Sequence, residues 1–159
     1  MRPGSGSRSE IAFAWLYVVV WIAAVQTFAG GVFSANETAR FFEPLMLWFN
    51  PDANAESIAA MHFAIRKTAH FVIYALLALL ALRAFRVSFD RPPAWLAAAS
   101  LVLALVVAVV DESRQAIAAE RTGALSDVAL DIGGAASALA VAVWRLGNAR
   151  AGLLGSLRK

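Results

Sequence analysis

The 159-residue sequence contains no cysteine and only two histidines, His62 and His70. The absence of cysteine excludes disulfide bonds, thiolate metal sites and a cysteine nucleophile. The chain also has no H-E-x-x-H motif, no G-x-S-x-G motif and no histidine pair at metal-ligand spacing, so the common signatures of metallopeptidases and serine hydrolases are missing. Nothing indicates a haem, a flavin or a nucleotide, and we expect neither a cofactor nor a metal ion.

Charged residues are scarce as well. They make up 16% of the chain, against about 25% in an ordinary soluble domain. Hydrophobic residues make up 60%, and the mean hydropathy is +0.66, which is too apolar for a disordered chain. The net charge is only +3, and there is no dense stripe of basic residues interleaved with aromatics, so nucleic acid is not an expected partner. The composition indicates a lipid environment, and the length favours one domain, residues 1–159.

Apolar runs indicate membrane-spanning helices. Four such runs are predicted: Ile11–Phe33, Ile58–Ala81, Trp95–Val110 and Leu125–Leu146. The first carries no charge and is long enough to cross the ~30 Å hydrocarbon core. It is also longer than the apolar part of a signal peptide, about 7–15 residues, and no A-x-A-like cleavage site follows directly. The predicted fold is therefore all-α, a polytopic membrane protein with a bundle of four transmembrane helices.

The connection between the first two spans contains a further apolar segment. Phe41–Phe49 is too short to cross a bilayer but rich in aromatic residues, as suits a short helix that lies at the membrane surface or re-enters it. A loop folded over the bundle is the alternative. Pro92 and Pro93 mark the start of the third span, because proline favours the first turn of a helix. We expect the two ends, residues 1–9 and 152–159, to be loose.

The charges are distributed unequally between the two sides of the predicted bundle. With the N-terminus in the cytoplasm, nine of the fourteen basic residues lie on the cytoplasmic side, and nine of the eleven acidic residues lie on the other. The two sides then carry net charges of +7 and −4. Because basic residues favour the cytoplasmic side, we expect a multi-pass protein of the cell inner (cytoplasmic) membrane with both termini in the cytoplasm.

Polar residues gather at the extracytoplasmic ends of three spans. On the second span, Lys67, His70 and Tyr74 share a narrow stripe at 100° per residue, with Arg66 adjacent. The third span carries Asp111 and Gln115 four residues apart. On the fourth, one face is shared by Asp127, Asp131, Gly134 and Ala138. A charge facing lipid at this depth costs several kcal/mol, so we expect these stripes to face one another or water.

These residues form three sequence blocks. They are R-K-x-x-H-x-x-x-Y at 66–74, D-E-x-x-Q at 111–115, and Arg121 followed by D-x-x-x-D-x-x-G at 127–134. Together the blocks resemble the VanZ-like family, which is named for a teicoplanin-resistance membrane protein. The resemblance covers about residues 65–140. It departs from the family at Asp131, where Asn is usual, so that a carboxyl group, which donates a hydrogen bond only when protonated, replaces an amide donor.

The resemblance implies an integral membrane protein associated with the cell envelope and linked to antibiotic resistance of the glycopeptide type. It does not supply a molecular activity. The type member lowers sensitivity to a lipoglycopeptide whose lipid tail and target lie at the outer leaflet. That is the side on which the charge distribution already places the polar residues.

A binding role is the leading hypothesis. The basic residues Arg66, Lys67 and Arg121 would engage the phosphate or carboxylate of an anionic membrane lipid or a lipid-linked cell-wall precursor. The remaining candidate ligand-binding residues would orient these cations or bind polar groups: His70, Tyr74, Asp111, Glu112, Gln115, Asp127 and Asp131. The structural alternative is an ion-paired plug that merely fixes the bundle.

Two further hypotheses are an enzyme and a transporter. His70 with Asp111 or Asp127 could act as general acid and base, or with Glu112 could hold a divalent cation, in a hydrolase or transferase working at the interface. A small ion-coupled carrier is the other, because intramembrane acids mark such pathways, although no inverted repeat is visible. The sequence leaves open a homodimer and a role as accessory subunit of a membrane complex.

Overall fold

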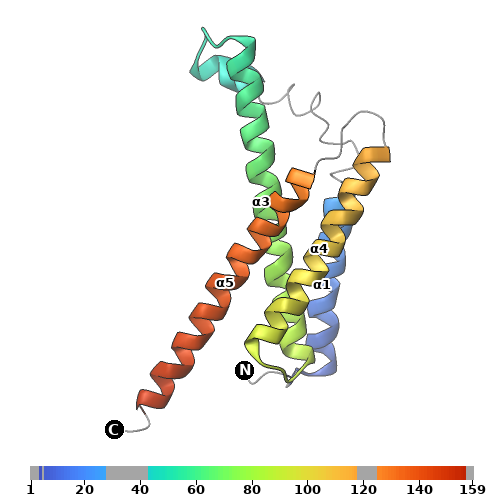
Figure 1. Ribbon diagram of the computed structural model, residues 1–159, viewed down its shortest axis with the longest axis vertical. Coiled ribbons are helices and arrows are strands. Elements are labelled where there is room, and N and C mark those ends of the chain that lie inside the picture. The colour runs from blue at the N-terminus through green and yellow to red at the C-terminus, as the bar shows by residue number, and fades with distance from the viewer. Residues whose placement is uncertain (1–3, 5, 28–42, 118–124, 157–159) are drawn as a thin grey trace.

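The computed structural model describes residues 4, 6–27, 43–117 and 125–156. Within them the chain forms four long helices, α1 (Arg8–Thr27), α3 (Ala55–Ser88), α4 (Pro93–Ile117) and α5 (Leu125–Ser156), and no strand. The helices run alternately up and down, so that α1 begins and α5 ends at the same end of the molecule (Figure 1). The predicted all-α, four-helix architecture is confirmed.

All four helices are long and apolar enough to cross a membrane. Their outer faces carry large exposed apolar side chains, such as Val19 on α1 and Val102 on α4, which are both 59% exposed. Such surfaces are unfavourable in water and suited to lipid. The chain is therefore a multi-pass membrane protein by the length and composition of its helices.

Local sequence signals explain where the helices begin. Ser7 and Glu10 form a capping box, in which the Ser7 hydroxyl accepts from the Glu10 amide at 3.2 Å and the Glu10 carboxylate accepts from the Ser7 amide at 2.7 Å. The Asn54 side chain accepts from the Ser57 amide at 2.8 Å and caps α3. Pro93 is the first residue of α4, as predicted from the Pro-Pro pair.

The aromatic segment after the first span is a short helix over 43–49, joined to α3 by the turn at 50–54. It lies beside the first turns of α3, beyond the ends of the other helices (Figure 1). Its Met46 is buried, whereas Trp48 and Phe49 are each 74% exposed. The alternative of a loop folded over the bundle is therefore wrong, and a relation of this helix to the membrane surface stays a prediction.

The central helix of the bundle is α3, which packs against α1, α4 and α5, while α4 also packs against α5. Side chains fully buried in this core include Tyr74 and Leu77 of α3, Val18 of α1 and Leu96 of α4. The indole of Trp15 on α1 donates to the Ser88 hydroxyl at 3.1 Å, and that of Trp21 donates to the Ile73 carbonyl at 3.1 Å. These bonds fix α1 antiparallel to α3.

The observed helices extend beyond the predicted spans. The predicted second span, Ile58–Ala81, is part of a longer helix that runs from Ala55 to Ser88. The ends expected to be loose are partly ordered: α1 begins at Arg8 and α5 continues to Ser156. Elongating an existing helix costs little free energy, and the Ala, Leu and Arg residues near the C-terminus favour it despite the glycines. The prediction for residues 28–33 lies outside the described residues.

Candidate functional site

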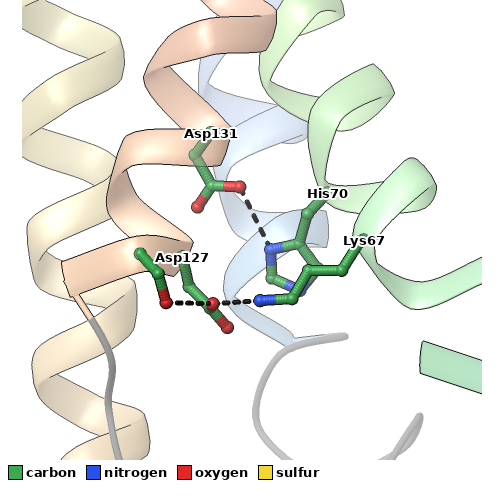
Figure 2. A network of polar contacts seen from close by, with 5 residues as sticks. Lys67, His70, Asp127 and Asp131 are labelled. Atoms are coloured by element: carbon green, nitrogen blue, oxygen red, sulfur yellow. Dashed lines mark hydrogen bonds and ion pairs between the residues drawn. The ribbon is translucent and has the colours of Figure 1, made fainter. Parts of the chain in front are cut away.

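Two polar stripes meet where α3 and α5 run side by side. The Lys67 ammonium donates to an Asp127 carboxylate oxygen in an ion pair, and three residues further along α3 His70 Nδ1 lies 3.2 Å from Asp131 Oδ1. Figure 2 shows both contacts, with the basic side chains reaching from α3 toward the acidic ones on α5. The two helices run in parallel, so residue spacings of three and four bring matching positions together.

The two pairs differ in burial. Lys67 and Asp127 side chains are 22% and 21% exposed, whereas Asp131 is only 3% exposed against 22% for His70. The Ser126 hydroxyl donates to Asp127 at 3.3 Å, and the Lys67 ammonium lies 5.1 Å from the Phe63 ring centroid. The outer pair is therefore partly open to solvent, while the inner pair places a carboxyl group inside the bundle.

Close contact at Gly134 sets the register of the two stripes. A Cβ atom added to Gly134 would lie 2.2 Å from the Phe71 carbonyl oxygen, whereas one added to Gly133 would meet nothing within 4 Å. Only glycine at 134 lets the two backbones approach this closely. This contact holds Asp131 and Asp127, one and two turns earlier on α5, opposite their partners on α3.

A third polar level lies deeper in the bundle and includes residues of α3 and α4. Tyr74 is fully buried, and Asp111 of α4 is 2% exposed. The Tyr74 hydroxyl has no hydrogen-bond partner among the described residues, although Asp111, Asp131 and Glu112 all act on it electrostatically. Asp111 and Glu112 take part in further polar interactions. α3, α4 and α5 thus all contribute polar side chains, as the shared depth of the sequence stripes predicts.

The other candidate residues are placed less completely. Arg66 is half-buried next to Lys67 and acts electrostatically on Asp127. Gln115 belongs to α4, but its side chain lies outside the described part of the structure, and Arg121 lies outside the described residues altogether. The hypothesis of His70 working with Asp111 or Asp127 meets a different geometry, since His70 lies within hydrogen-bond distance of Asp131.

One polar contact at the same end of the bundle as the Lys67–Asp127 pair joins two residues that were not among the candidates. The Arg114 guanidinium of α4 donates to the Gln26 side chain of α1 at 2.6 Å. The available sequence signal was Gln26 itself, the single amide side chain in the uncharged run 11–33, because a lone amide in a membrane helix needs a partner. Arg114 itself lies within the D-E-x-x-Q block. The contact connects the C-terminal ends of α1 and α4.

The polar layer lies near one edge of the expected hydrocarbon region. Lys67 is twenty-one residues from Ser88, which at 1.5 Å per residue is about 32 Å along α3. This matches the ~30 Å hydrocarbon thickness. The first turns of α3, with the 43–49 helix beside them, then extend past the edge. Within the described residues, no three His, Asp or Glu side chains are grouped so that they could hold a metal ion.

A family model described as VanZ/LLP1 matches residues 12–146, which is most of the chain. The protein belongs to the VanZ/LLP1 family. The match extends from α1 to the last third of α5 and includes all three sequence blocks. No curated protein and no solved structure is significantly similar to the chain.

The structure shows how two blocks of this VanZ-family protein fit together. The α3 block contributes Lys67, His70 and Tyr74, and the α5 block contributes Asp127, Asp131 and the close-contact Gly134. Asp131, at the position where Asn is usual in VanZ-like proteins, is the partner of His70. Either an ionised carboxylate or an amide oxygen can accept from Nδ1–H of histidine, so this replacement preserves the acceptor.

Proposed function

We propose that this VanZ-family membrane protein binds the phosphate of an anionic lipid, or of a lipid-linked cell-wall precursor, at the α3–α5 polar layer. The observation that carries the proposal is the partly exposed Lys67–Asp127 pair at the expected membrane edge, next to Arg66. A lipid phosphate resides at this depth, and a cation that is already held in place loses less entropy on binding it.

The basic residues of the layer have capacity left for a ligand. Lysine has three donors and uses one on Asp127. Arg66 is half-buried and makes no hydrogen bond or ion pair with any other described residue. Arginine suits bidentate contacts with phosphate, and lysine acts as a point charge beside it. Two neighbouring cations of different geometry therefore favour a phosphate over an isolated carboxylate.

The proposal includes an orientation. The charge asymmetry favours both termini in the cytoplasm and the polar layer on the extracytoplasmic side of the cell inner membrane. A ligand would then be taken from the outer leaflet, where cell-wall precursors and a glycopeptide with a lipid tail, such as teicoplanin, are found. A link to glycopeptide resistance would follow from occupation of that surface.

A purely structural role is the main competing explanation. An ion-paired plug needs no exposure to solvent, and its charges gain most when they are fully enclosed by partners. Here burial is graded: the outer pair is about one fifth exposed on both sides, and only the inner carboxyl is enclosed. A graded layer that opens at the membrane edge favours access by a ligand.

The His70–Asp131 pair supports an interfacial hydrolase or transferase as the second candidate. A histidine oriented by a carboxylate is a common arrangement for general acid–base catalysis. Its Nε2 atom, on the opposite side of the ring from the bonded Nδ1, would be the group that moves a proton. Loss of lipid-phosphoester turnover in a folded His70→Ala protein would favour this candidate over simple binding.

An ion-coupled carrier has less support. A carrier needs polar groups that continue across the bilayer. Below Tyr74 the buried face of α3 is apolar, with Leu77, Ala78, Ala81 and Leu82 almost inaccessible. Among the described residues, the other buried polar side chain toward that end is Ser100, whose hydroxyl donates to the Leu96 carbonyl of its own helix. The buried polar side chains of α3 thus end at Tyr74, within the half of the bundle that contains Lys67.

The binding proposal can be tested by native mass spectrometry of the full chain in detergent with added phosphatidylglycerol. We expect Lys67→Ala combined with Arg66→Gln to weaken retention of this lipid at least tenfold, because two cationic contacts are lost. Arg145→Gln is a matched control, since Arg145 is an exposed basic residue at the other end of α5. Equal loss in the control, or unchanged retention in the double variant, would contradict a specific site.

A further inference from the structure

Tyr74 is the most unusual polar residue of the bundle. Its side chain is completely buried, and its hydroxyl finds no hydrogen-bond partner among the described residues. A buried hydroxyl left unsatisfied is costly, and such groups in native proteins generally have a partner that explains them. Phenylalanine would fill the same space without that cost. The hydroxyl therefore calls for a function beyond packing.

The surroundings of this hydroxyl are acidic. Asp131, which contacts His70 one turn before Tyr74 on α3, and Asp111 of α4 are 2% exposed each, and together with Glu112 they lie within electrostatic range of the Tyr74 hydroxyl. Carboxylates accept hydrogen bonds, whereas a phenol can donate one. A group that enters here must therefore accept from Tyr74 and donate to a carboxylate. An anionic phosphate is repelled at this level, while an alcohol hydroxyl meets both requirements.

Tyr74 follows His70 by one turn on α3, directly below the α3–α5 polar layer. Side chains of a helix tilt toward its N-terminus, so Tyr74 should lean toward the level of His70. Lys67, Asp127 and His70, each about one fifth exposed, lie between Tyr74 and the expected membrane edge. Lys67 and Tyr74 are seven residues apart, about 10 Å along the helix. An ammonium–phosphate contact, a three-carbon polyol and a hydroxyl–phenol contact in series span about that distance.

We propose that Tyr74, with Asp131 and Asp111, forms an inner subsite for a hydroxyl group of the ligand headgroup, which selects polyol phospholipids. Tyr74 donates to the ligand oxygen, and the ligand hydroxyl donates to a carboxylate. Lys67 and Arg66 hold the phosphate, and the inner subsite binds a hydroxyl of the headgroup alcohol that is esterified to it. This inference rests on the proposed phosphate binding and names the class of headgroup.

Phosphatidylglycerol and phosphatidylethanol provide a matched pair of probes. Both carry one phosphodiester charge, and the glycerol headgroup has one carbon and two hydroxyls more than the ethyl headgroup. Retention of each lipid by the full chain is measured in native mass spectrometry, for the unmodified protein and for Tyr74→Phe. We expect the unmodified protein to prefer phosphatidylglycerol about tenfold, as one or two added hydrogen bonds allow. In Tyr74→Phe that preference should fall to near one, with phosphatidylethanol retention unchanged.

The melting temperature in lipid-free detergent gives an independent readout that also reports folding. Removing a hydroxyl that has no partner in the described part of the structure should leave the melting temperature unchanged or raise it by a few degrees. Added phosphatidylglycerol should stabilise Tyr74→Phe less than the unmodified protein. Equal retention of both lipids by the unmodified protein, an undiminished preference in Tyr74→Phe, or a lower melting temperature of that lipid-free variant would overturn the inner subsite. Failure of either lipid to bind above phosphatidylcholine would instead overturn the phosphate site itself.

Discussion

At the residue scale, the site consists of complementary pairs in a low-dielectric environment. Lys67 with Asp127 and His70 with Asp131 connect α3 to α5 at two successive levels. A single charge at such a depth costs several kcal/mol, and a partner removes most of that cost. Removing both residues of a pair should therefore cost less stability than the sum of the two losses measured when each is removed alone.

A double-mutant cycle on Lys67 and Asp127 tests this coupling. We expect Lys67→Met and Asp127→Asn each to lower the free energy of unfolding by about 1–3 kcal/mol, because each leaves the other residue unpaired. The double variant should lose less than the sum, with a coupling energy of about 1 kcal/mol, since the pair is partly exposed. Denaturant unfolding in mixed micelles measures all three, and strictly additive losses would contradict the ion pair.

Asp131 offers a prediction about the residue usual in the family. In Asp131→Asn the amide oxygen can still accept from His70 Nδ1–H, so the free energy of unfolding should change by less than about 1 kcal/mol. Asp131→Leu has a similar size but no acceptor, and we expect it to cost about 1–3 kcal/mol. A loss in Asp131→Asn as large as that in Asp131→Leu would show that the carboxylate charge itself is required.

At the scale of the elements, one close helix contact controls the register of the site. The backbones of α5 and α3 come into close contact where Gly134 faces the Phe71 carbonyl oxygen, and the acidic residues of the polar pairs lie one to two turns earlier on α5. Below it, α5 diverges from the other helices toward its C-terminal end (Figure 1). The polar contacts therefore depend on a glycine that carries no chemistry of its own.

Gly134→Ala and Gly133→Ala form a matched pair of variants on this contact. The added methyl group at 134 would overlap backbone atoms of α3, so we expect a loss of about 1–3 kcal/mol and weaker lipid retention through displaced Asp127 and Asp131. At 133 the methyl group meets open space, and higher helix propensity should leave stability unchanged or improved by up to about 1 kcal/mol. Equal effects at the two positions in the same unfolding assay would refute the close contact.

At the scale of the whole molecule, hydrophobic length and charge explain most of the architecture. The four spans and the shared face of Asp127, Asp131 and Gly134 were predictable from apolar run lengths and helical periodicity. The start of α1 was equally readable, because Ser7 and Glu10 have the spacing of a capping box, yet the first nine residues were expected to be loose.

Tertiary register was beyond the reach of sequence patterns. Periodicity places His70 on a face but does not decide whether Asp111, Asp127 or Asp131 lies opposite, because that depends on the height at which Gly134 meets α3. The bond between Gln26 and Arg114 joins residues eighty-eight positions apart, and no local signal pairs them. The burial of the Tyr74 hydroxyl without a hydrogen-bond partner among the described residues likewise results from the packing of several helices.

The central claim, that Lys67 contacts a lipid phosphate, can be measured directly because the chain has only two lysines, Lys67 and Lys159. In a Lys159→Arg protein, ¹⁵N-labelled lysine places a single ammonium label at Lys67. Solid-state ³¹P–¹⁵N dipolar recoupling in bilayers containing phosphatidylglycerol then reports the distance from Nζ to phosphorus. The proposed site predicts strong dephasing, corresponding to direct ammonium–phosphate contact, that Arg66→Gln weakens. A Lys67 signal with no ³¹P dephasing, in a folded protein within the same bilayers, would contradict the claim.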